Sequence, residues 1–202
     1  MKRQIYSSTI KAIPYMYYNS KKIAILMMEG KTGKELKKYC LDNNIIGVDS
    51  IERNKEVTSK IFDRLIRLDD YLLDCFVKSD IITSKFILLY AIMKQDRLFF
   101  EFMFEIYREA IINEKKYISL DDFDYFFKTK KESNIKVSTW GRYTLDQISK
   151  AYRNVLKESG FGRNDKRNII IVNQLIHPNV IKHIMSDDGD YLKAIFGGIN
   201  DE

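Results

Sequence analysis

The stretch that decides the fold class is RNKEVTSKIFDRLIRLDDYLLDCFV, at residues 53–77. Its apolar residues recur at steps of three and four, and they are Val57, Ile61, Leu65, Leu68, Leu72 and Phe76. This spacing is the period of an α-helix that turns one face to a core, whereas a half-buried strand alternates at every second residue. The sequence therefore predicts one long amphipathic helix over 53–77.

The helical pattern extends to both sides of this stretch. Further helices are predicted at 20–29, 32–43, 83–94, 96–113, 119–131 and about 140–159. Only two Pro and nine Gly interrupt the 202 residues, and their scarcity favours long helices over many strands and tight turns. The best strand is residues 168–172, NIIIV, directly after the turn-rich basic loop 162–167.

These elements predict a mainly α fold, a helical bundle with helix-turn-helix and winged-helix-like parts and a small β element near residues 161–172. We expect three closely packed subdomains, or one domain with three parts. Residues 1–60 would form an N-terminal helix-turn-helix-like part, 61–134 a central helical bundle, and 135–202 a C-terminal winged-helix-like part.

Composition excludes several classes of protein. Hydrophobic residues make up 45% of the chain, which is enough to build a core, so a disordered protein is excluded. The longest apolar run, residues 86–93, is far below the roughly 20 residues that span a bilayer. The N-terminus lacks the sustained apolar stretch of a signal peptide. We therefore expect a cytoplasmic protein without a membrane partner.

The residues that carry chemistry are too sparse for a catalytic or metal site. His177 and His183 are six residues apart and do not share a helix face, and Cys40 and Cys75 are widely separated in the sequence. The segment 29–34, EGKTGK, lacks the glycine spacing and the preceding strand of a phosphate-binding loop. We expect no enzyme activity, no bound metal and no cofactor.

The formal charge of the chain, +6, is unevenly distributed along the sequence. Residues 1–38 carry nine Lys or Arg against two acids, and residues 128–167 carry eleven against four. Two basic blocks on either side of a mildly acidic middle are typical of a surface that binds a polyanion such as nucleic acid. An ordinary basic protein surface is the alternative.

The predicted helix at 141–158 and the loop after it form the first candidate interface. On an ideal helix its four cations fall within about 80°, opposite an apolar face. The candidate nucleic-acid-binding residues are Arg142, Lys150, Arg153 and Lys157 of the helix and Arg163, Lys166 and Arg167 of the loop. Helix, basic turn and strand in this order are the second half of a winged helix, whose helix enters the major groove while the wing touches phosphate. A solvated basic helix over a core is the alternative.

The pair of N-terminal helices, 20–29 and 32–43, forms a second candidate interface. A tight turn at Gly30 joins them, and their candidate nucleic-acid-binding residues are Lys31, Lys34, Lys37 and Lys38. Helix-turn-helix geometry also occurs in proteins that bind nothing, so we favour the C-terminal block as the main binding surface.

An ordered series of apolar and charged patterns resembles the BrxA family of the BREX bacterial phage-defence systems. The patterns are SKIFDRLIRL at 59–68, ILLYAI at 87–92, FFEFM at 99–103 and LKESG at 156–160. The resemblance covers about residues 5–196. It implies a small helical protein similar in shape to the antitermination factor NusB, with winged-helix-like parts, that binds double-stranded DNA and has no catalytic motif.

We therefore predict a non-catalytic subunit of a BREX system that binds duplex DNA mainly through phosphates, with little base readout. Other BREX subunits are expected partners, and the oligomeric state is left open. One alternative is a structural adaptor whose basic patches dock acidic protein partners. RNA binding, which the similarity to NusB suggests, is another.

Overall fold

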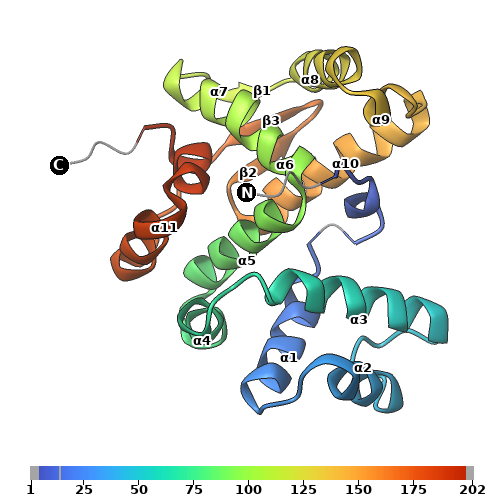
Figure 1. Cartoon of the computed structure of the whole chain (residues 1–202). Coiled ribbons are helices and arrows are strands. Elements are labelled where there is room, and N and C mark those ends of the chain that lie inside the picture. The colour runs from blue at the N-terminus through green and yellow to red at the C-terminus, as the bar shows by residue number, and fades with distance from the viewer. Residues whose placement is uncertain (1–4, 14, 199–202) are drawn as a thin grey trace. The chain divides into compact units, whose positions relative to one another are not determined.

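The computed structural model of the chain describes residues 5–13 and 15–198. Within these residues helices dominate, and strands are confined to one small antiparallel sheet (Figure 1). The predicted mainly α fold with a small β element is confirmed. The chain divides into two compact units, the inserted unit at residues 15–95 and the discontinuous unit at residues 1–14 and 96–202. The division into three functional subdomains stays a prediction.

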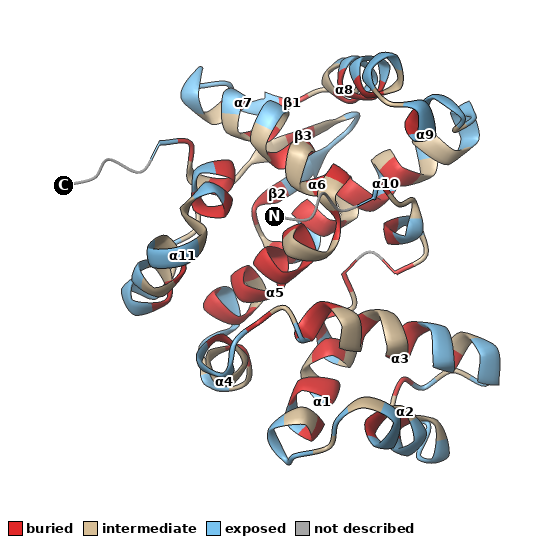
Figure 2. Cartoon of the chain, viewed as in Figure 1, coloured by how far each residue is buried: buried red, intermediate tan, exposed pale blue. Residues whose placement is uncertain are grey.

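The inserted unit is helical throughout. Its helices are α1 (Tyr17–Met28), α2 (Gly33–Asp42), α3 (Ile51–Leu65), α4 (Asp70–Lys78) and α5 (Ile81–Gln95). α1 packs on α3 and α4, α2 packs on α3, and α5 packs on α3 and α4. Residues 86–93 of α5 are all buried. Figure 2 shows α5 largely in the colour of buried residues.

The prediction of one helix over 53–77 is wrong. The chain leaves α3 after Leu65, and α4 begins with Asp69 as its N-cap, whose carboxylate accepts the backbone N–H of Leu72 at 2.8 Å. Leu68, between the two helices, is still buried. The apolar stripe therefore continues across the break, because the local cap ends one helix and starts the next without moving the buried side chains out of the core.

A buried arginine joins the two ends of the inserted unit. The guanidinium of Arg64 donates from Nη1 to the backbone carbonyl of Tyr15 at 2.8 Å, and from Nε to the side-chain oxygen of Gln95 at 2.9 Å. Arg64 is only 2% exposed, so these hydrogen bonds satisfy a charge that would otherwise be costly to bury. The first and last residues of the unit are thus fixed to α3.

The discontinuous unit combines helices with the sheet. Its elements are η1 (Thr9–Lys11), α6 (Arg97–Phe102), η2 (Met103–Tyr107), α7 (Arg108–Ile112), β1 (Tyr117–Ile118), α8 (Leu120–Ser133), α9 (Ile135–Ser138), α10 (Arg142–Ser159), β2 (Gly162–Asp165), β3 (Asn168–Ile171) and α11 (Pro178–Phe196). The segment η2 is one π-helical turn between α6 and α7. The predicted helix 96–113 is therefore continuous, with a π turn inside it.

The sheet has the strand order β1-β3-β2, and both pairings are antiparallel. Ile170 of β3 lies opposite Tyr117 on one side and opposite Arg163 on the other. The strand predicted at 168–172 is confirmed by β3. β1 was not predicted, because a strand of two residues carries no periodic signal in the sequence.

An aromatic core fixes α8 and α10 onto α6. The ring of Phe102 in α6 lies 4.7 Å from that of Phe123 and 5.4 Å from that of Phe126, both in α8. The same ring lies 5.2 Å from that of Tyr152 in α10. Aromatic pairs at these separations add to the free energy gained from burial, so α8 and α10 are positioned by one shared ring.

Candidate nucleic-acid interface

α10 has one buried face and one cationic face, as its sequence predicts. The buried residues are Ile148, Ala151, Tyr152, Val155, Leu156 and Ser159. Arg142, Lys150 and Lys157 are exposed and Arg153 is half-buried. The helix ends at Gly160, whose φ of +88° is a conformation that glycine adopts without strain. This cap turns the chain directly into β2.

α8 and α10 line an open groove of about 720 Å³. The residues that line it are Leu120, Phe123, Asp124, Phe127, Lys128, Lys131 and Glu132 of α8, and Arg142, Leu145, Asp146, Ser149, Lys150 and Arg153 of α10. Three of the four cations predicted on this helix thus lie on one side of it, facing α8. Lys157, the fourth, is exposed on α10 outside the groove.

The groove has a cationic rim and an apolar floor. Its lining includes five cations and three acids, so positive charge prevails. Phe123 and Phe127 are almost fully buried, and only their edges reach the groove. Leu120 and Leu145 complete the apolar part of the lining. The arrangement suits an anionic polymer that presents charges to both helices and some apolar surface to the floor.

Two residues of the groove were missed from the sequence, Lys128 and Lys131 of α8. They are three apart and therefore neighbours on one side of the helix, which the sequence does show. The sequence does not show that this side faces α10, because the pairing of the two helices is set by tertiary contacts.

The hairpin β2–β3 brings the remaining C-terminal candidates to the end of α10. Arg163, Lys166 and Arg167 are all exposed. Lys166 has a φ of +50°, in the left-handed region that a side chain other than Gly, Asn or Asp rarely adopts. Its carbonyl oxygen accepts a hydrogen bond of 3.5 Å from Arg153. Helix and hairpin cations thus belong to one continuous surface of the discontinuous unit.

The N-terminal candidates lie in the inserted unit, and two of them are engaged there. Lys31 forms an ion pair of 3.3 Å with Glu29 and lies over the ring of Tyr39. Lys37 lies over the ring of Phe62, 5.4 Å from its centre. Lys34 and Lys38 are exposed, in and near the first turns of α2. Among the candidate residues, the N-terminal set therefore has fewer exposed cations than the C-terminal set.

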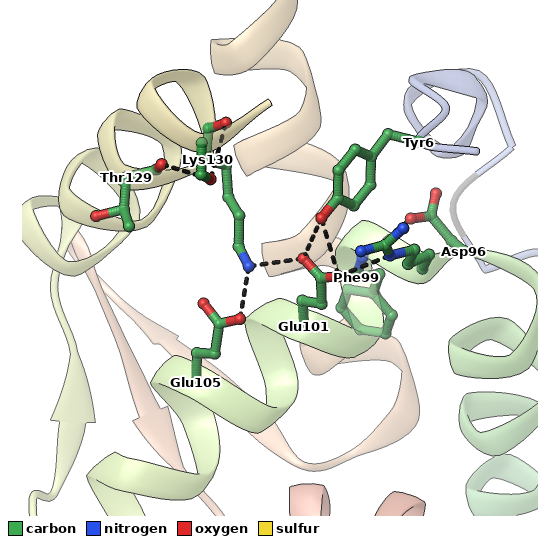
Figure 3. Close-up of polar contacts among 9 residues, drawn as sticks. Tyr6, Asp96, Phe99, Glu101, Glu105, Thr129 and Lys130 are labelled. Atoms are coloured by element: carbon green, nitrogen blue, oxygen red, sulfur yellow. Dashed lines mark hydrogen bonds and ion pairs between the residues drawn. The ribbon is translucent and has the colours of Figure 1, made fainter. Parts of the chain in front are cut away.

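An ion cluster around the buried Lys130 holds α8 in place (Figure 3). Lys130 of α8 is 7% exposed, and its ammonium group lies 2.6 Å from Glu101 and 2.5 Å from Glu105. Glu101 also accepts hydrogen bonds of 2.7 Å from Tyr6 and from Arg97. Since Lys130 points inward, the rotation of α8 about its axis is fixed, and the neighbouring Lys128 and Lys131 are directed to the groove.

The cluster keeps Glu101 ionised. Burial by itself would raise the pKa of Glu101, but the hydrogen bonds from Lys130, Tyr6 and Arg97 outweigh it and hold the pKa below its ordinary value. Burial of the phenol, together with its hydrogen bond to the same carboxylate, raises the pKa of Tyr6 to about 12. Both groups thus keep fixed protonation states at neutral pH, which suits a structural anchor.

The described residues contain neither a cluster of metal ligands nor a membrane-spanning helix. Across 5–13 and 15–198, no three His, Cys, Asp or Glu side chains are grouped so that they could hold a metal ion. His177 is the N-cap of α11, where its Nδ1 accepts the backbone N–H of Asn179. Among the helices of these residues, none is long and apolar enough to cross a membrane.

The fold and the site define a mainly helical protein that carries a cationic groove and a basic hairpin on one unit. The sequence profile of the BrxA family matches residues 4–188. The "BREX protein BrxA" of Bacillus cereus (strain H3081.97) is 38% identical over 198 residues, which are 98% of this chain and 99% of that protein. The chain belongs to the BrxA family.

The fold also occurs in a crystal structure of an uncharacterized protein from Magnetospirillum magneticum. The TM-score is 0.78, with 15% sequence identity over 95% of this chain and 97% of that one. At this identity the likeness concerns the fold alone.

Proposed function

We propose that this protein is a non-catalytic, duplex-DNA-binding component of a BREX phage-defence system. The observation that carries the proposal is the gathering of cations from α8, α10 and the β2–β3 hairpin on one surface. Its family membership supports the BREX assignment, because the relative from Bacillus cereus carries that name. Other subunits of such a system are the expected protein partners.

The order of elements around the groove supports duplex DNA as the ligand. β1, α8, α9, α10, β2 and β3 follow one another with the strand order β1-β3-β2. This order supports the proposal that they form a winged helix. In such domains the helix before the hairpin enters the major groove, and the hairpin acts as the wing. α10 has 18 residues and is therefore about 27 Å long, enough to cross a major groove about 12 Å wide.

Most of the affinity would come from phosphates. The cations on the rim of the groove and on the hairpin are lysines and arginines, which neutralise phosphates and release condensed counterions. Contacts of this kind position the protein on the duplex and are nearly independent of base sequence. Binding should therefore weaken steeply as salt rises.

An acidic protein partner is the rival ligand, and the apolar floor of the groove favours it. An acidic amphipathic helix could place apolar side chains over Leu120 and Leu145 and carboxylates against the rim. RNA is a second rival, since a cationic surface alone does not distinguish it from DNA.

A filter-binding series separates these ligands. The purified protein would be titrated against duplex DNA, single-stranded DNA and duplex RNA at several salt concentrations. The proposal expects duplex DNA to bind most tightly, with a linear fall of log affinity against log salt. Absence of nucleic-acid binding even at low salt would favour the adaptor, and preference for RNA would favour the second rival. We propose that the isolated protein shows neither nuclease nor ATPase activity in parallel assays.

A further inference from the structure

One stripe of α10 runs along the edge of the cationic side that faces α8 and shares Lys150 with it. Tyr143, Gln147, Lys150 and Asn154 follow one another at steps of four, three and four, and on an ideal helix they fall within about 60°. Tyr143 is 74% exposed and Lys150 is exposed. The acids nearest to this stripe, Asp146 and Glu158, lie on opposite sides of it. The stripe is thus polar and free of negative charge, with Tyr143 and Lys150 exposed and its two amides half-buried.

The two amides of the stripe are not used in hydrogen bonds that hold the described part of the fold together. Gln147 and Asn154 are half-buried, and neither side chain makes a hydrogen bond to any residue within 5–13 or 15–198. Asn is a poorer helix former than Ala, because its side chain competes with the backbone for hydrogen bonds. Asn154 nevertheless stands in the interior of an 18-residue helix, where it caps neither end.

We propose that Gln147 and Asn154 read adenine in the major groove, which rests on the proposed binding of duplex DNA by α10. An Asn or Gln amide accepts a hydrogen bond from N6 of adenine and donates one to N7, a pattern that no other base offers in this groove. Seven residues of helix correspond to about 10.5 Å, or about three base-pair steps of 3.4 Å. The preferred sites therefore carry adenine at two positions about three base pairs apart.

The neighbours of the two amides fit this role. Tyr143 presents an exposed ring on the same stripe, where it can pack on the methyl group of a thymine. Arg142 and Arg153 line the groove beside α8, away from the stripe, and remain available for phosphates. Phosphate contacts thus supply affinity that is common to all sequences, and the amides add a preference.

A selection from a pool of duplexes with a randomised core tests the inference. The pool would be separated once by gel shift with the full-length protein, and bound and input DNA would be sequenced. We expect the wild type to enrich adenine at least about fivefold at two positions about three base pairs apart, since one bidentate pair discriminates by that factor or more. Asn154→Ala should abolish the enrichment of adenine at one of these positions, and Gln147→Ala should abolish it at the other. Asn179→Ala, an exposed amide of α11, is the matched control and should keep both.

Two further variants keep the test valid if an alanine variant is poorly folded. Asn154→Asp and Gln147→Glu are nearly isosteric, and a carboxylate accepts from N4 of cytosine. Each should turn the adenine preference at its own position into a cytosine preference.

Each of three outcomes would overturn the inference. Duplex binding without any enrichment would overturn it and leave the proposed function standing. Enrichment of adenine that persists in all four variants would show that residues other than Gln147 and Asn154 recognise it. No binding of any duplex at low salt would overturn the proposed function together with it.

Discussion

The guanidinium of Arg153 in α10 lies 3.5 Å from the main-chain carbonyl oxygen of Lys166, in the turn between β2 and β3. This contact joins the helix to the hairpin. The hairpin carries two further exposed cations near Lys166 in the sequence, Arg163 and Arg167. A hydrogen bond of this length between exposed groups adds little stability. Its importance is geometric, because it places helix and hairpin cations on one surface that a single duplex can contact.

The turn itself gives a prediction in which stability and binding change in opposite directions. Lys166 has a φ of +50°, which strains a lysine and not a glycine. Lys166→Gly should therefore leave the free energy of unfolding unchanged or raise it by up to about 1 kcal/mol. The same change should weaken duplex binding and reduce the slope of log affinity against log salt by about 0.9, because one phosphate contact is lost. Urea unfolding and filter binding measure the two effects.

Lys166→Asn is the control for backbone flexibility at the turn. Asn tolerates the left-handed region and removes the charge, so it should weaken binding as much as Lys166→Gly does. Unchanged binding in both variants would mean that the hairpin does not contact DNA.

Substitutions on the cationic face of α10 should change the slope of log affinity against log salt more than the Lys166 variants do. Replacing Arg153 and Lys157 together by Ala should reduce the slope by about 1.8 and weaken binding similarly for unrelated duplexes. The melting temperature should change little, since Lys157 is exposed and Arg153, although half-buried, lies outside the buried face and makes a long hydrogen bond of 3.5 Å to the carbonyl of Lys166. If binding falls only because the protein unfolds, this face is part of the core.

The matched control lies in the inserted unit. Lys34 and Lys38 are exposed, and replacing both by Ala should leave the slope nearly unchanged if the C-terminal surface is the main one. The opposite result, with the slope lost in this variant and kept in the Arg153 and Lys157 variant, would make the N-terminal block the DNA surface.

The sequence shows the faces of individual helices well. The buried face of α10 follows from its apolar period, and the strand at β3 follows from three consecutive isoleucines. The break between α3 and α4 was missed, although Asp69 is a good N-cap residue, because Leu68 and Leu72 continue the apolar stripe across it.

The groove could not be predicted, because it depends on how two helices meet. Lys128 and Lys130 are two residues apart in one basic run, yet one lines the groove and the other is buried against Glu101. Nothing in the sequence distinguishes them without the acidic partner on α6. The predicted site therefore contained the cations of α10 and lacked those of α8.

The ion cluster around Lys130 gives a prediction for acid stability. Since the pKa of Glu101 in the folded protein lies below its ordinary value of 4.5, its contribution to stability is fully present above pH 4.5 and is lost as the pH falls through the folded pKa. Glu101→Gln should lower the free energy of unfolding at pH 7 by about 2 kcal/mol, because Lys130 loses the charge of one carboxylate partner and keeps Glu105. The difference from the wild type should shrink below pH 4.5.

Urea unfolding of both proteins from pH 7 to pH 3 measures this difference. Glu158→Gln, which removes an exposed carboxylate of α10, should follow the wild type throughout. If the free energies of unfolding of the wild type and Glu101→Gln differ by the same amount at every pH from 7 to 3, the role assigned to Glu101 is contradicted.

Substitution by Phe should change the free energy of unfolding differently at two buried tyrosines of the discontinuous unit. The hydroxyl of Tyr107 donates to the carbonyl oxygen of Phe161 at 2.7 Å, whereas the buried hydroxyl of Tyr152 has no hydrogen-bond partner among the described residues. Tyr107→Phe should lower the free energy of unfolding by about 1 kcal/mol, since the carbonyl keeps its second bond from Val172. Tyr152→Phe should leave it unchanged or raise it by about 1 kcal/mol, because it removes a polar group whose burial is uncompensated. Urea unfolding at pH 7 compares the two variants, and an equal loss in both would show that the Tyr152 hydroxyl is hydrogen-bonded in solution.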